Sequence, residues 1–123
     1  MTIAFWCVLV AGLLPYVATA IAKSRPGFDN ANPRAWLANL DGFRARAVAA
    51  QLNSFEAFPF FATAVIVAYV RGASQGTIDM LAMAFIAIRI VYLALYLANL
   101  ATLRTFVWIA GVACVVTMFF VGG

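Results

Sequence analysis

Four long apolar runs dominate the chain, and they leave very few folds open to it. They cover about residues 2–22, 47–70, 78–98 and 105–121. At about 1.5 Å of rise per residue, runs of this length can cross a hydrocarbon core of roughly 30 Å as helices. They are too long for strands and lack the alternation typical of a transmembrane barrel. A helical bundle is the architecture that still pairs every backbone group within lipid.

The overall composition supports a membrane location. The chain is 67% hydrophobic and 10% charged, whereas a soluble domain is about 25% charged. Four spans leave almost nothing for a second domain, so we predict one transmembrane domain over residues 1–123, an all-α integral membrane four-helix bundle. A cleaved signal peptide is the alternative for the first run, since residues 18–20 look like a cleavage site. No Lys or Arg precedes that run, as a signal peptide would require.

Positive charge is concentrated in two of the three connections between the runs. The second connection has only Arg71, with Asp79 close behind. By the positive-inside rule, the first and third connections face the cytoplasm and both termini lie on the opposite side. Acidic and proline residues dilute the basic first connection, so topology explains it better than nucleic-acid binding. The basic residues of the first and third connections and their borders are Lys23, Arg25, Arg34, Arg44, Arg46 and Arg104.

Several kinds of chemistry lack their usual residues. The chain has no histidine, and its two cysteines, Cys7 and Cys114, lie inside predicted spans. We therefore expect no metal site and no disulfide. Small four-helix proton-coupled exporters are similar in size, but they depend on a carboxylate in the first helix, and residues 1–22 contain none.

Polar side chains form a stripe on one face of the second predicted span. A helix advances about 100° per residue, so Arg46, Asn53 and Glu56 share a face. Pro59 follows within the same span and is expected to kink it. Polar groups in hydrocarbon cost a few kcal/mol each, and chains keep them mainly where they line a protein interior or a cavity. This stripe is the first candidate for a functional site.

The third span has a matching stripe of Arg89, Tyr92 and Tyr96, at i, i+3 and i+7. Glu56 and Arg89 are each ten residues from the cytoplasmic end of their span, about 15 Å deep. The short connection at 71–77 makes these two spans antiparallel neighbours. We therefore predict an ion pair between Glu56 and Arg89. The two stripes have two interpretations. In one, the ion pair is structural and sets the register of the helices; in the other, the stripes form a site for a small zwitterionic ligand with carboxylates.

Two motifs in the stripes resemble those of a known family. Residues 50–60, Ala-Gln-Leu-Asn-Ser-Phe-Glu-Ala-Phe-Pro-Phe, are similar to the second-helix signature of the MAPEG family, the membrane-associated proteins in eicosanoid and glutathione metabolism. The signature is closest to that of the leukotriene-C synthase branch. Residues 89–92, with Tyr96 and then Arg104 and Thr105, resemble the same family and its prostaglandin-E synthase branch. Helix number, length and order are similar along nearly the whole chain.

The resemblance implies a bacterial-type member that forms a homotrimer and binds glutathione between subunits near the cytoplasmic side. Such a protein is a transferase or peroxidase that attacks a lipophilic electrophile with the glutathione thiolate. A guanidinium beside a thiol favours the charged form, and this role falls to Arg104. The resemblance assigns the contacts to glutathione to the remaining polar residues. Its assignment of Arg46 and Gln51 is weaker than that of the others. The full set is Arg46, Gln51, Asn53, Glu56, Arg89, Tyr92 and Tyr96.

Two departures from the family pattern keep a second function open. Ala49 stands where the synthases place an arginine that grips glutathione, and the spacing from Tyr96 to Arg104 differs by one residue from each synthase branch. The alternative is a non-catalytic ligand- or lipid-binding membrane protein with the same fold.

Overall fold

Residues 1–122 are described by a computed structural model, and within them every regular element is a helix. The helices are α1 (Ile3–Ala22), α2 (Pro33–Ala38), α3 (Gly42–Val70), α4 (Gln75–Leu97) and α5 (Ala101–Met118). In this part of the chain, α1, α3, α4 and α5 are long and apolar enough to cross a membrane. The expected all-α, four-helix membrane architecture is confirmed.

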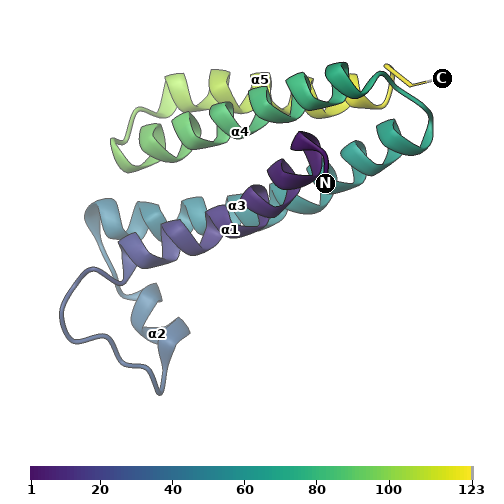
Figure 1. The fold of residues 1–123 in the computed structure, drawn as a ribbon. Helices are drawn as coiled ribbons and strands as arrows, with labels where there is room; N and C mark the ends of the chain where they lie inside the picture. The colour runs from purple at the N-terminus through teal and green to yellow at the C-terminus, as the bar shows by residue number, and fades with distance from the viewer. Residues whose placement is uncertain (123) are drawn as a thin grey trace.

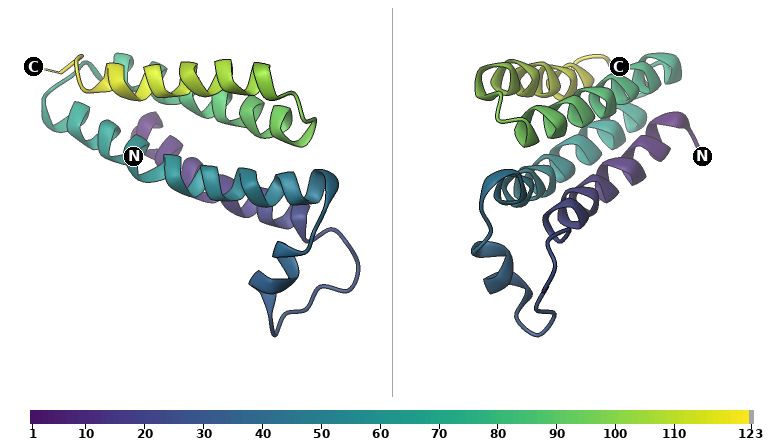
Figure 2. Two further views of the ribbon diagram at one scale, coloured as in Figure 1. Left: turned by 180° about the vertical axis from the view of Figure 1, so that it is seen from behind. Right: turned by 90° about the vertical axis from the view of Figure 1, so that its left-hand side faces the viewer.

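The four long helices run alternately in opposite directions along the chain (Figure 1). Helix α1 packs mainly on α3, and α4 packs mainly on α5, so the bundle has two layers. Figure 2 shows the same two pairs from behind and from one end. Helix α3 joins the layers because it also packs on α4 and α5. The polar stripes of α3 and α4 are therefore adjacent.

Small side chains allow the helices to approach closely. Ala4, Ala64, Ala68 and Ala82 are fully buried in the main core. Such residues bring helix backbones together where lipid supplies no hydrophobic drive for association. At the centre, residues of α3 and α4 form a parallel stack, with the ring centroids of Phe61 and Phe85 4.2 Å apart.

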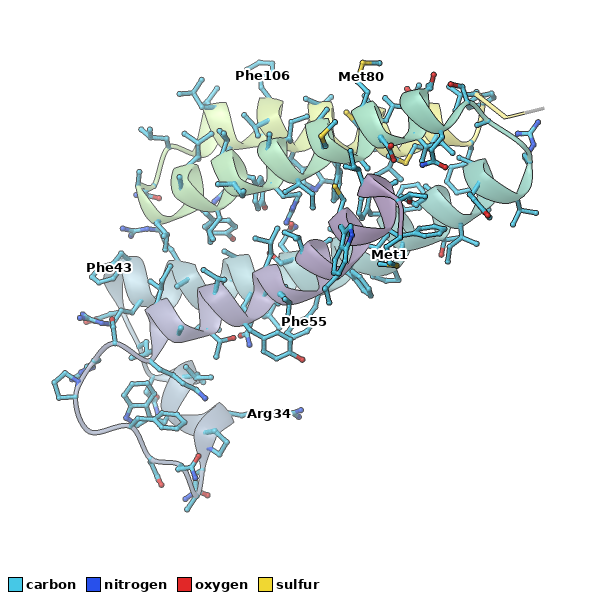
Figure 3. All side chains as sticks on the ribbon, in the orientation of Figure 1. Met1, Arg34, Phe43, Phe55, Met80 and Phe106 are labelled. Carbon is cyan, nitrogen blue, oxygen red and sulfur yellow. The ribbon has the colours of Figure 1, made fainter. Side chains whose placement is uncertain are left out.

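Large apolar side chains point away from the bundle, as lipid-facing residues do. Met80 and Phe106 lie on the outer side of the α4–α5 layer (Figure 3), and they are 61% and 65% exposed. Water would disfavour this much apolar surface, whereas hydrocarbon accepts it.

The first connection is more ordered than the turn-forming residues predict, because it contains the short helix α2. Pro33 lies at the start of that helix, where its fixed φ suits the first turn. Trp36 and Leu37 pack against a small second core of Ala22, Leu40 and Ala47. Helix α3 also begins at Gly42 rather than near residue 47, so Arg44 and Arg46 belong to its first turns.

A tight turn joins α4 to α5. Asn99 adopts a φ of +61°, a left-handed conformation that asparagine tolerates better than most residues. Only residues 98–100 lie between the two helices. The turn thus brings the first turn of α5, with Arg104, beside the last turn of α4, with Tyr96.

At the opposite end of the bundle, Asp79 of α4 holds the start of α1. Its Oδ1 accepts a hydrogen bond from the backbone N–H of Ala4 at 2.9 Å and from Gln75 Nε2 at 2.7 Å. The first N–H groups of a helix have no partner within the helix. Asp79 supplies one from a neighbouring helix, while Thr2 caps the N–H of Phe5.

Candidate functional site

The site begins where α3 and α4 face each other in the middle of the bundle. Arg89 is 5% exposed, and its Nη2 donates a hydrogen bond of 2.6 Å to Asn53 Oδ1. The guanidinium carbon of Arg89 also lies 4.2 Å from the ring centroid of Tyr92, one turn along α4. The buried cation is thus held by an amide and an aromatic face.

The predicted ion pair between Glu56 and Arg89 is wrong for the described chain. Within residues 1–122 these two side chains form no ion pair, and Arg89 bonds to Asn53 instead. Glu56 is exposed on α3, although both residues line one cavity. Counting residues gives depth along a helix, but the direction of each side chain around the axis depends on how the helices pack. In this bundle, the packing of α3 against α4 directs the Arg89 side chain toward Asn53.

A ladder of stacked groups continues from Arg89 toward the end of the bundle. The rings of Tyr92 and Tyr96 meet edge to face, with centroids 5.7 Å apart. The guanidinium carbon of Arg104 then lies 4.1 Å from the centroid of Tyr96. Cation–π contacts of this kind are worth about 0.5–2 kcal/mol, depending on desolvation. The ladder connects α4 to the first turn of α5 and brings two guanidinium groups to one side of the bundle.

Two cavities open beside this ladder. The first, here called the apolar cavity, has a volume of about 170 Å³. The second, the polar cavity, has a volume of about 190 Å³. The apolar cavity is lined by Asn53, Glu56, Ala57, Phe60, Phe85, Arg89, Trp108, Gly111, Val112 and Val115. The polar cavity is lined by Asn53, Tyr92, Arg104, Thr105 and Trp108.

Asn53 and Trp108 line both cavities, so a polar compartment adjoins an apolar one at these two residues. Polar side chains make up most of the polar cavity's lining, whereas aromatic, aliphatic and glycine residues make up most of the apolar cavity's lining, to which Glu56 and Arg89 add two charges. This arrangement suits a polar, anionic molecule placed next to an apolar one. Asn53, Glu56, Arg89, Tyr92, Tyr96 and Arg104 are thus brought together.

Two predicted binding residues lie elsewhere. Arg46 donates from Nε and Nη2 to the carbonyl oxygen of Leu97, at 3.2 and 3.1 Å, and so caps the end of α4. Gln51 lines a separate groove of about 550 Å³ between α2 and α3. Gln51 is two residues from Asn53, which places it about 200° around the helix.

Trp108 and Thr105 were missed by the sequence reasoning, although both line the polar cavity. A signal for Trp108 was present, because it follows Arg104 by four residues and therefore shares its face of α5. An isolated tryptophan in an apolar run reads as a lipid-facing residue, and Trp108 is indeed 42% exposed.

Comparison with curated proteins and with solved structures returned no match. The chain does match the sequence profile of the MAPEG family over residues 3–123. That match spans all four membrane-length helices and both polar stripes. The protein is therefore an integral, multi-pass membrane protein that belongs to the MAPEG family.

Proposed function

We propose that the protein is a membrane-bound, glutathione-dependent transferase or peroxidase that acts on a lipophilic electrophile. The observation that carries the proposal is the polar cavity with the Arg104 guanidinium in its wall, adjoining an apolar cavity at Asn53 and Trp108. Glutathione is polar and anionic, and its partner substrate is apolar. A site for both needs two compartments that meet at the reacting sulfur.

The charge of the site supports an anionic ligand. Arg89 is buried within a span, and its hydrogen-bond partner there is a neutral amide. A cation removed from water and left without a carboxylate creates a positive potential around it. Arg104 adds to that potential from the polar cavity. The two carboxylates of glutathione complement this field, and its ammonium complements Glu56.

Arg104 has the central chemical role in the proposal. Its guanidinium lowers the pKa of the bound glutathione thiol, because a nearby cation stabilises the thiolate. The thiolate then attacks an electrophilic atom of the substrate in the apolar cavity and forms the new bond to sulfur. The leaving group departs with the bonding electron pair.

Asn53, Glu56, Tyr92 and Tyr96 are the proposed contacts to the tripeptide, together with the electrostatic contribution of Arg89. Arg46 is assigned a peripheral contact through Nη1, since Nε and Nη2 are bonded to Leu97.

A homotrimer with glutathione between subunits is part of the proposal. Glu56 is exposed on the surface of a single chain, although it lies within a membrane-length helix. An exposed carboxylate in a span needs water or protein beside it rather than lipid. The groove lined by Gln51 is a second surface for contact between subunits. In the proposed trimer a neighbouring subunit packs there, and Gln51 contacts the glutathione bound to that neighbour.

The second candidate function is non-catalytic binding of a ligand or lipid by the same fold. Ala49 favours it, because an alanine cannot replace the grip of an arginine on a carboxylate. Glutathione affinity and turnover separate the two candidates.

The test uses the full chain purified in detergent. Glutathione binding is measured by calorimetry, and conjugation is measured with a generic aryl halide. S-methylglutathione is the control, because it keeps the carboxylates but has no thiol to ionise. Binding of both peptides with turnover of glutathione supports the transferase. Binding without turnover supports the non-catalytic alternative, and absence of glutathione binding refutes the glutathione-dependent transferase or peroxidase.

A further inference from the structure

The hydrogen bond between Arg89 and Asn53 also determines which way the amide group of Asn53 is turned. Every nitrogen of a guanidinium carries hydrogen and none can accept, so the atom of Asn53 that faces Arg89 must be the amide oxygen. The bond of 2.6 Å is therefore an N–H donated by Arg89 to Oδ1. The usual ambiguity between the oxygen and nitrogen of an amide does not arise here.

The orientation of the oxygen determines where the nitrogen points. In the planar amide, Oδ1 and Nδ2 are bonded to the same trigonal carbon and point in different directions, so Nδ2 is turned away from Arg89. Among residues 1–122, Arg89 is the hydrogen-bond partner of the Asn53 side chain. No buried side-chain nitrogen or oxygen in that range lacks a partner, so the unbonded Nδ2 is accessible. Asn53 lines both cavities and offers them a donor.

Arg89 itself has little freedom to adopt another role. Its side chain is 5% exposed, and its guanidinium is held between the Asn53 oxygen and the Tyr92 ring. Its Nη2 is bonded to Asn53, and the side chain also lines the apolar cavity. Its planar, rigid fork makes the orientation of Asn53 sharper than a lysine would.

We infer that Arg89 is a positioning residue, which locks Asn53 with its Nδ2–H₂ toward the site. Asn53 then selects a hydrogen-bond acceptor on the ligand, a carboxylate or peptide carbonyl oxygen, and not a donor. The inference deepens the proposed function and rests on it for the identity of the ligand. The orientation of Asn53, however, exists without any ligand.

The first experiment measures that orientation directly by NMR. The full chain is labelled with ¹⁵N in asparagine side chains, and the Asn53 resonances are assigned from their loss in Asn53→Leu. Arg89→Leu should move the Asn53 side-chain resonances to the values of the solvent-exposed asparagines, and Arg89→Lys should restore them in part. Arg71→Leu is the matched control, because Arg71 bonds to the carbonyl of Phe119 at the other end of the bundle. Unchanged Asn53 resonances in Arg89→Leu would overturn the positioning role, whether or not glutathione binds.

The second experiment asks whether Arg89 acts through Asn53 or touches the ligand itself. Glutathione dissociation constants are measured for Asn53→Leu, Arg89→Leu and the double variant. Loss of one hydrogen bond to a charged or carbonyl acceptor weakens binding by about tenfold or more. If Arg89 acts mainly through Asn53, the two losses do not multiply, because the double variant adds to the loss in Asn53→Leu only that of the Arg89 charge. Losses that multiply to about a hundredfold identify a direct contact and overturn the inference.

Asn53→Asp tests the donor itself and guards against variants that fail to fold. It keeps an oxygen for Arg89, so folding is retained, but it turns a second acceptor toward the site. Glutathione affinity should fall at least as far as in Asn53→Leu, and an unchanged affinity would refute the donor. If the wild-type chain does not bind glutathione, the proposed function fails, and the NMR experiment still decides the orientation of Asn53.

Discussion

The guanidinium carbon of Arg104 lies 4.1 Å from the ring centroid of Tyr96, which joins the first turn of α5 to the last turn of α4. The contact holds the cation at the wall of the polar cavity. Arg104→Ala should therefore cut turnover at neutral pH while largely sparing glutathione affinity, because the thiol pKa returns toward its free value of about 8.5. Ultraviolet absorbance of the bound thiolate, measured against pH, checks this. Turnover and the thiolate signal of Arg104→Lys should lie between those of the wild type and Arg104→Ala, because lysine keeps the positive charge but lacks the planar guanidinium.

Substitutions of Tyr96 test whether its contact with Arg104 affects the pKa of the bound thiol. Tyr96→Phe keeps the aromatic face and should preserve the thiolate, whereas Tyr96→Leu removes the face and should raise the thiol pKa part of the way toward that of Arg104→Ala. A full thiolate signal in both Arg104→Ala and Tyr96→Leu would remove Arg104 from the chemistry.

Filling the apolar cavity should affect the electrophile and not the peptide. Val112 lines this cavity from α5, so Val112→Phe reduces the space for an apolar substrate. We expect kcat/KM for the aryl halide to fall about tenfold, which corresponds to roughly 1.4 kcal/mol of transition-state stabilisation. Glutathione affinity should not change. Val116→Phe, on the same helix but 40% exposed and outside the cavity lining, is the control. Equal losses in the two variants would show that bulk on α5, rather than the cavity, is responsible.

Asp79 should stabilise the bundle through the start of α1. Asp79→Ala removes the acceptor for the N–H of Ala4, and loss of a helix cap costs about 1 kcal/mol. Thermal unfolding in detergent should shift to lower temperature. Asp79→Asn keeps an oxygen at this position and should recover most of the loss. A melting temperature unaffected by Asp79→Ala would mean that the contact contributes nothing measurable.

Arg46 should stabilise the end of α4. Arg46→Leu removes two donors from the carbonyl oxygen of Leu97, so the free energy of unfolding should fall by about 1–3 kcal/mol. Arg46→Lys should restore part of it. Arg44→Leu is a neighbouring control, because Arg44 bonds to the Ser24 hydroxyl in the first connection. If Arg46→Leu weakens glutathione binding without changing stability, the capping role is minor and the ligand contact is the main one.

The orientation in the membrane remains a prediction from the distribution of charge. A reporter fused to the C-terminus should read as non-cytoplasmic, and a probe in the connection between α1 and α3 should read as cytoplasmic. The reverse pattern would place the polar cavity, which lies at the same end of the bundle as that connection, on the other side of the membrane.

Much of the fold follows from local properties of the sequence. The length of each apolar run and the scarcity of charge within it determine the number and order of the spanning helices, because backbone groups in lipid must pair within their own segment. The spacing of Arg89, Tyr92 and Tyr96 likewise determines that they share a face, since the helical repeat is a property of the backbone. Beyond this shared face, the contact of Tyr96 with Arg104 depends only on the short turn at Asn99, which brings the start of α5 beside the end of α4.

The pairing of the polar groups was decided by the tertiary structure. The short connection at 71–77 correctly predicted that the helices of Glu56 and Arg89 are neighbours, yet Arg89 bonds to Asn53, and Arg46 bonds to a backbone carbonyl. The rotation of each helix about its axis depends on how buried side chains such as Phe61 and Phe85 stack across the interface. That rotation is set by packing between segments distant in the sequence, and the pattern within one helix carries no information about it.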